Sequence, residues 1–171
     1  MVRPSTSLLE ETLEAWAYAR QGVIAEVKNL PVGGFDFRPT PATRSVTELV
    51  QHIIESGLMM SGELTSPKTD FTRQSFSRFI KQYAGQVRRR RSKSSLLRLL
   101  VASHAKGDKQ FRQTGELLML QLVSRFDGEK WTRLSWMQHG IAHEEYHRAQ
   151  LALYSRLLGR VPALTKLIHG S

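Results

Sequence analysis

The sequence contains no cysteine. Disulfides, thiolate metal sites and a cysteine nucleophile are therefore excluded, and any bound metal must be held by nitrogen and oxygen ligands. The lack of cysteine also fits a reducing compartment, so we expect a cytoplasmic protein. No apolar run approaches the roughly 20 residues that a membrane helix needs. The start, MVRPSTSLLEET, has no long apolar segment after Arg3, so we expect no secretory signal.

Acidic residues are missing from one stretch of the chain. Between Arg73 and Arg98 there are nine Lys and Arg residues and no Asp or Glu, although the whole sequence of 171 residues has 15 acids and a net charge of +10. The basic character is therefore local. A run of cations is typical of nucleic-acid binding or of a solvated linker. No recognition motif surrounds its densest part, which favours the linker for Arg88, Arg89, Arg90 and Arg91.

Apolar residues recur at helical spacings of three, four and seven in several segments. The first helix is predicted from about Ser7 to Asn29 and ends at Leu30-Pro31. A second helix follows the sequence S-V-T-E. There Ser45 can accept a hydrogen bond at the start of the helix while Glu48 reaches back to the N–H of Ser45. The second half of the chain has similar periodicity, so most of the sequence is expected to be helical.

Two more helices are predicted after an irregular basic connection over residues 62–93, which has no clear period. The third helix begins near Ser94 and continues to about Leu118. Strands around LMLQLV and EKWTRL could instead form a small hairpin, but we favour the continued helix. The fourth helix, from about Thr132 to Gly159, has the clearest pattern. With no repeat or linker, these segments predict an all-α fold, a four-helix bundle in a single domain over residues 1–171.

One helix carries histidines on three successive turns. In HGIAHEEYHRAQ, each of His139, His143 and His147 is four residues from the next. This step advances about 6 Å and rotates about 40° along a helix, so neighbours can converge on one ion. The first and last are about 12 Å apart, too far for a single ion whose bonds to nitrogen are about 2.1 Å. The helix therefore offers one pair, either His139 and His143 or His143 and His147.

A third ligand has to come from another helix. The candidates are His52 in the second helix and His104 in the third, whereas His169 is near the end of the sequence. Glu144 and Glu145 could hold an imidazole N–H or could be solvated charges. The HEEYH segment also matches the zincin pattern H-E-x-x-H. A long bundle helix lacks the sheet edge usual in those proteases, so we do not favour peptide hydrolysis.

Two segments carry motifs of a known family. HEEYHRAQLALYSRLLG resembles the pattern HExxHRGQ…YLRLLG, and FRPTPATRSVTELVQHIIESG resembles W-x-P…S-V-x-E-L-x-x-H-I-x-x-x-E. Both patterns belong to the DinB-like (damage-inducible) family of metal-binding bundles. The resemblance covers the first, second and fourth helices and is weak from Gly62 to Lys130. Ala149 stands where the family usually has Gly, and the basic segment is not a trait of the family.

The resemblance implies an antiparallel four-helix bundle in an up-down-down-up arrangement, frequent dimers, and a divalent metal held by three histidines. By motif, the ligand on the second helix maps to His52 and the pair on the fourth helix maps to His143 and His147, while His139 falls outside the match. The family also implies transfer of small thiols to electrophiles, thiol-dependent isomerisation, or hydrolysis.

Three imidazoles leave an open coordination position, which catalytic metal sites keep. They suit zinc, nickel, iron, copper or manganese. Glu55 and Tyr146 lie near the ligands in helical position and are candidates for an acid, base or orienting group. We therefore expect a homodimeric metal-dependent thiol transferase or hydrolase acting on a small molecule. The alternatives are a non-catalytic metal-binding bundle and a nucleic-acid-associated protein that uses the segment Arg88 to Arg91.

Overall fold

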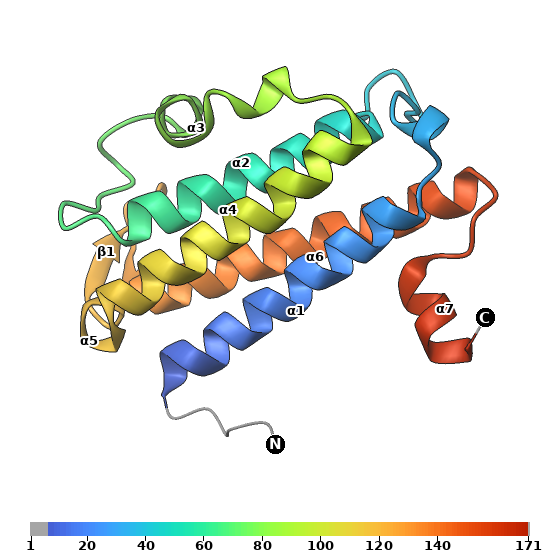
Figure 1. The fold of residues 1–171 in the computed structure, drawn as a ribbon. Helices are drawn as coiled ribbons and strands as arrows, with labels where there is room; N and C mark the ends of the chain where they lie inside the picture. The colour runs from blue at the N-terminus through green and yellow to red at the C-terminus, as the bar shows by residue number, and fades with distance from the viewer. Residues whose placement is uncertain (1–6, 171) are drawn as a thin grey trace.

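Four long helices form the body of the protein in the computed structural model, which describes residues 7–170 (Figure 1). They are α1 (Leu8–Asn29), α2 (Val46–Leu64), α4 (Lys93–Thr114) and α6 (Arg133–Leu157). Ser7 caps α1, and Ser45 and Glu48 form the predicted capping box at the start of α2. The expectation of no secretory signal rests on the start of the sequence, which lies largely outside the described residues. Within residues 7–170, no helix is both long and apolar enough to cross a membrane.

The four helices have the predicted up-down-down-up order. α1 and α6 run in one direction, and α2 and α4 run in the other (Figure 1). α1 packs on α6 and α4, while α2 packs on α4 and α6. Each helix therefore has one parallel and one antiparallel neighbour. The all-α four-helix bundle expected from the hydrophobic periodicity is confirmed.

The connection between α2 and α4 has to run back along the bundle because these neighbouring helices are parallel. The 19 residues of α2 correspond to a length of about 28 Å. The connection is less irregular than predicted, since it contains α3 (Phe76–Ala84) and a short 3-10 helix, η2 (Val87–Arg89). Phe79 and Ala84 are buried, and α3 packs on α2. The sequence did not predict α3, because two buried residues in a nine-residue helix do not make a recognisable hydrophobic periodicity.

The preference for a third helix continued to Leu118 was wrong. α4 ends at Thr114, because Gly115 adopts a φ of +77°, which favours glycine. A four-residue helix, α5 (Glu116–Met119), follows, and then β1 (Leu122–Ser124) and β2 (Lys130–Thr132) form an antiparallel hairpin. The alternative hairpin is therefore present. The fourth helix is as predicted, with Thr132 as its N-cap and Gly159 at a φ of +71° just beyond its end.

Smaller elements complete the fold at the end of the bundle opposite the hairpin. A 3-10 helix, η1 (Val32–Gly34), follows α1. α7 (Ala163–His169), which the sequence did not predict, packs on α1. The side chain of Glu26 accepts a hydrogen bond from the backbone N–H of Leu164 at 3.4 Å. The end of the described chain is thus held against the first helix.

A buried polar cluster divides the hydrophobic core into two parts. One apolar cluster includes Val23 and Leu151, and the other includes Leu13 and Met137. Between them, Arg20 of α1 forms a two-pronged ion pair with Glu144 of α6, and its second contact, from Nη2 to Oε2, measures 3.0 Å. Arg20 and Glu144 are only 1% and 3% exposed, respectively. The ion pair therefore ties α1 to α6 in the middle of the bundle.

Further hydrogen bonds satisfy the remaining groups of this cluster. Trp16 Nε1 donates to Glu144 Oε2 at 3.0 Å. Arg20 Nη1 donates to the carbonyl oxygen of Leu100 and to Ser103 Oγ on α4, both at 3.0 Å. A buried charge pair is stable only when its geometry is good and its other polar atoms are satisfied, and both conditions are met here. The cluster links α1, α4 and α6.

Replacing Glu144 with Ala should strongly destabilise the protein, because it leaves the Arg20 guanidinium buried without a counter-charge. We expect the free energy of unfolding to fall by about 3–5 kcal/mol. The matched control is Asp108→Ala, since Asp108 pairs with Arg112 in an i,i+4 ion pair that is largely open to solvent. That change should cost less than about 1 kcal/mol. Urea denaturation measures both values, and equal losses would contradict the assigned role of the buried pair.

Candidate metal centre

Three histidines from two helices meet between α2 and α6. His52 Nε2 lies 3.1 Å from His143 Nε2, and His143 Nε2 lies 3.0 Å from His147 Nε2. Each residue offers one ligand atom to a group in which all three atoms lie within 4.8 Å of one another. The three rings pack edge to face, with centroids 4.3–5.0 Å apart. The set is the one implied by the family motifs.

The helices bring these rings together for simple geometric reasons. His143 and His147 are one turn apart on α6, so their side chains point the same way. The capping box fixes the start of α2 at Val46, six residues before His52, and α2 packs directly on α6. His147 Nδ1 lies 2.8 Å from Gln150 Oε1. Because an amide oxygen only accepts, Nδ1 carries the proton, which leaves the Nε2 lone pair of His147 free.

Burial keeps the three imidazoles neutral. It lowers the pKa of His52 from 6.5 to about 3, with a further contribution from the positive charge of Arg44. Burial also lowers the pKa of His143 to about 4, helped by His147, and it lowers the pKa of His147. A neutral imidazole has a lone pair, and a protonated one cannot bind a cation. At neutral pH the three nitrogens are therefore available as ligands.

The donor set fits a divalent transition metal. Two nitrogens bound about 2.1 Å from one ion are about 3.0 Å apart at a right angle and about 3.4 Å apart at the tetrahedral angle. Two of the three separations, 3.0 and 3.1 Å, lie at the lower end of this range, and all three ligand atoms lie within 4.8 Å of one another. Three imidazoles suit zinc, nickel, copper or iron, and a three-ligand set leaves an open position. That these residues hold a metal stays a prediction.

The other histidines lie elsewhere. His104 packs on Trp16, with ring centroids 4.4 Å apart, and its Nε2 has no hydrogen-bond partner among the described residues. His139 is exposed and stacks on Trp136, with centroids 5.1 Å apart. His169 is exposed at the end of α7. Neither His104 nor His139 therefore joins the cluster, and the pair formed on α6 is His143 and His147.

Glu55 and Tyr146, the candidates for an acid, base or orienting group, differ in their surroundings. Glu55 is buried one turn after His52, and its carboxylate accepts hydrogen bonds from Arg88 at 2.8 and 3.3 Å. It is therefore occupied by an ion pair. Tyr146 is 63% exposed, and its ring contacts that of His147 with centroids 5.1 Å apart. Neither contact assigns an acid or base role, so both roles stay predictions.

Part of the basic segment Arg88 to Arg91 contacts the helix bundle. Arg88 pairs with Glu55, and Gln51 donates to the carbonyl oxygens of Arg88 and Arg90 at 3.3 and 2.7 Å. Arg91 lies 3.6 Å from Asp36 at the surface. The guanidinium of Arg88 thus lies near the histidines, which the linear sequence gave no reason to expect. Arg89 and Arg90 are exposed.

Glu144 does not contact the histidine ligand atoms. Its carboxylate is held by Arg20 and Trp16 in the core, and Glu145 pairs with Arg148. The glutamate of the H-E-x-x-H pattern is therefore bound elsewhere, which agrees with setting aside a zincin mechanism. Sequence reasoning missed Arg20 as the partner. Its position four residues after Trp16 places it on the buried stripe of α1, a signal that could have revealed it.

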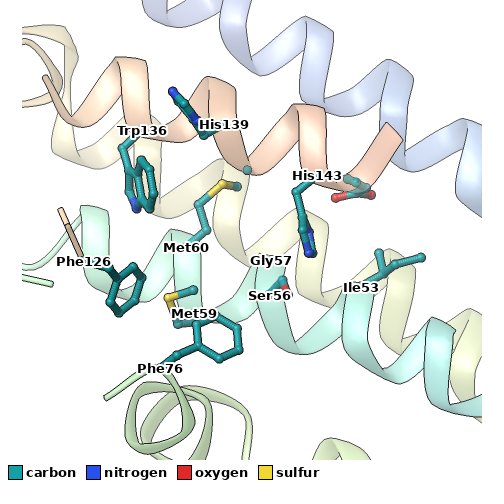
Figure 2. A pocket seen from close by; sticks show the side chains of 12 residues that line it. Ile53, Ser56, Gly57, Met59, Met60, Phe76, Phe126, Trp136, His139 and His143 are labelled. Carbon is teal, nitrogen blue, oxygen red and sulfur yellow. The ribbon is translucent and has the colours of Figure 1, made fainter. Parts of the chain in front are cut away.

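Two cavities flank the triad, and sequence reasoning found neither. The apolar cavity, of about 270 Å³, lies between α2 and α6 on the side of His143, as Figure 2 shows. Its walls include Met59, Met60, Phe76, Phe126 and Trp136. The cationic cavity, of about 400 Å³, lies on the side of His52 between α2 and α3. Its charged walls are Arg44, Glu55, Lys81 and Arg88.

The fold is shared with two solved proteins of Bacillus subtilis. YfiT, described as a probable metal-dependent hydrolase with an unusual four-helix bundle topology, superposes with a TM-score of 0.70 at 16% identity over 94% of each chain. The DinB-like protein YjoA superposes with a TM-score of 0.67 at 17% identity, over 88% of this chain and 93% of its own. At these identities the likeness shows the fold alone. No curated protein matches this chain.

The family of this chain is identified by a family model that matches almost the whole sequence. The model of the DinB family covers residues 1–169, and so includes both helices that carry the histidine triad and the basic connection where the motifs were weak. The up-down-down-up bundle and the convergence of His52, His143 and His147 agree with this match. This chain is a member of the DinB family.

Proposed function

We propose that this protein is a metal-dependent enzyme that binds a divalent ion through His52, His143 and His147. The reaction is attack by a nucleophile, either water or a small thiol, on an electrophilic substrate, which makes the protein a hydrolase or a thiol transferase. The single observation that carries the proposal is the convergence of three neutral imidazoles beside an apolar cavity. The description of YfiT as a probable metal-dependent hydrolase supports the same class.

The ligands, the residue that orients one of them and the cavity walls would each have a separate role in the reaction. A divalent ion held here supplies Lewis acidity toward a water, a thiol sulfur or a substrate oxygen. The three imidazoles carry no charge of their own, so they leave the charge of the ion undiminished for the substrate. Gln150 holds the ring of His147 in one orientation. The apolar side chains around His143 keep water away from the bound substrate, which strengthens electrostatic interactions in the site.

The alternatives have less support. A non-catalytic metal-binding bundle needs no cavity next to its ligands, whereas this site has one on each side. Nucleic-acid binding through Arg88 to Arg91 would draw on a guanidinium that is already paired with Glu55. The homodimer and the identity of the metal stay predictions.

Removing any one ligand should abolish tight metal binding. We expect His52→Ala, His143→Ala and His147→Ala each to lower the affinity for zinc or nickel by more than about 100-fold, since even loss of a supporting hydrogen bond costs about 10–100-fold. Metal analysis of untagged protein and competition with a chelator measure this. The matched control is His139→Ala, one turn earlier on α6, which should bind like the unmodified protein. Loss of binding in that control alone would move the site by one turn.

Gln150→Ala should weaken metal binding less than loss of a ligand does. The change removes the acceptor for the Nδ1 proton of His147 and leaves the ligand nitrogens in place. The expected loss of affinity is about 10–100-fold. The same chelator competition measures it. An affinity equal to that of the unmodified protein would show that Gln150 does not orient the ring.

The metal-free protein should lose stability as the pH falls below about 6.5. In the unfolded chain these histidines take up protons near their ordinary pKa of 6.5, whereas in the folded protein the pKa of His52 is about 3 and that of His143 is about 4. The unfolded state therefore binds more protons between pH 6.5 and about 4, and acidification favours it. Urea denaturation across this range should show a decline that is smaller in His52→Gln. An identical decline in that variant would contradict the assignment.

A further inference from the structure

The two cavities beside the triad differ in chemistry. The apolar cavity is walled by two methionines and by the aromatic rings of Phe76, Phe126 and Trp136 (Figure 2). The cationic cavity has three cations, Arg44, Lys81 and Arg88, against the single carboxylate of Glu55. One cavity therefore favours an apolar group, and the other favours a negative charge.

Both cavities border the same site. His143 lines the apolar cavity, and His52 lines the cationic one. The ligand nitrogens of these two residues are 3.1 Å apart. Phe76, at the start of α3, borders both cavities. The two cavities therefore adjoin at Phe76 and at the neighbouring nitrogens of His52 and His143.

The apolar cavity is large enough for an aromatic ring. A cavity of about 150 Å³ lined by apolar side chains holds benzene, and this one measures about 270 Å³. Ser56 adds one hydroxyl to its wall, and that oxygen has no hydrogen-bond partner among the described residues. His139, His143 and Glu144 also line this cavity. The cavity thus accepts a ring or a short alkyl chain that meets a few polar groups.

Two of the three cations are free to bind a ligand. Arg88 is paired with Glu55. The side chains of Arg44 and Lys81 make no ion pair or hydrogen bond within residues 7–170 and are exposed at the cavity. Arg44 also lies near enough to act electrostatically on all three histidines. A negative group next to His52 would therefore gain two partners without breaking an existing pair.

We propose that the substrate is an amphipathic anion. Its apolar arm, an aromatic or short alkyl group, occupies the apolar cavity beside His143, and its negatively charged group binds Arg44 and Lys81 beside His52. This inference rests on the proposed function for the role of the histidines, and it adds the class of substrate. The reacting bond lies between the two ends of the molecule.

Binding of matched small probes to zinc-loaded protein tests the proposal. The probes are 4-phenylbutane-1-sulfonate, its neutral N,N-dimethylsulfonamide, which has no N–H to ionise on zinc, and butane-1-sulfonate, which lacks the ring. A sulfonate is a poor metal ligand, so it reports on the cations and not on the zinc. Calorimetry should show the ring-bearing sulfonate binding about tenfold more tightly than the neutral probe, since each exposed ion pair contributes a few-fold. It should also bind more tightly than butane-1-sulfonate, which buries less apolar surface.

Variants of Arg44 and Lys81 test the contribution of the cationic cavity separately from that of the apolar cavity. Replacing both Arg44 and Lys81 with Gln should remove the preference for the sulfonate over the sulfonamide and leave sulfonamide binding unchanged. The matched control is Arg98→Gln, an exposed cation on α4 that lines neither cavity, and it should keep the preference. Equal binding of the two ring-bearing probes, or an Arg98→Gln effect as large as that of the double variant, would overturn the proposal.

Zinc content measured in the same samples distinguishes this inference from the proposed function. A protein that binds zinc but shows no preference among the probes overturns the amphipathic anion and leaves the metal-dependent reaction standing. A protein that takes up no zinc yet keeps the preference overturns the metal-dependent reaction and supports the ligand site.

Discussion

The ion pair between Arg20 and Glu144 sets the rotation of α6, and the histidine site depends on that rotation. Successive residues on a helix are turned by about 100°. When Glu144 points inward to Arg20 and Trp16, His143 and His147 are directed toward α2, where His52 completes the triad. A rotation of α6 by one residue would place a charge against apolar side chains and would separate the imidazoles. The same orientation of α6 therefore serves both the core and the site.

One linked group of buried polar side chains lies in the middle of the bundle. The buried ion pair and its hydrogen bonds separate an apolar cluster toward the hairpin from another toward α7. Other buried charges lie outside this layer, such as Glu63, which pairs with Arg73, and Glu26, which accepts a hydrogen bond from the start of α7. The triad lies alongside this layer, where a neutral imidazole is favoured over a charged one. The same burial that makes the layer costly keeps the ligand nitrogens unprotonated.

Features set by local sequence could be predicted, whereas those that depend on distant contacts could not. The capping box at Ser45 and Glu48 and the helix ending before Gly159 rest on neighbouring residues, and both are present. Periodicity did not reveal the hairpin after α5, because its strands are three residues each. The partner of Glu144 is 124 residues away. The motif placed His52 with His143 and His147, but the cavities arise only from the packing of α3 and the hairpin loop beside α2 and α6.

The topology itself explains why the site has a wall on the side of α3. Because α2 and α4 run parallel, the chain must return along the bundle before α4 begins, and the return segment packs on α2 through α3 (Figure 1). That return segment supplies Phe76, Lys81 and Arg88 to the cavities. An up-down-up-down bundle with short loops would leave the same triad open to solvent. A connection of this length is thus a requirement of the topology, and here it also lines the cavities beside the triad.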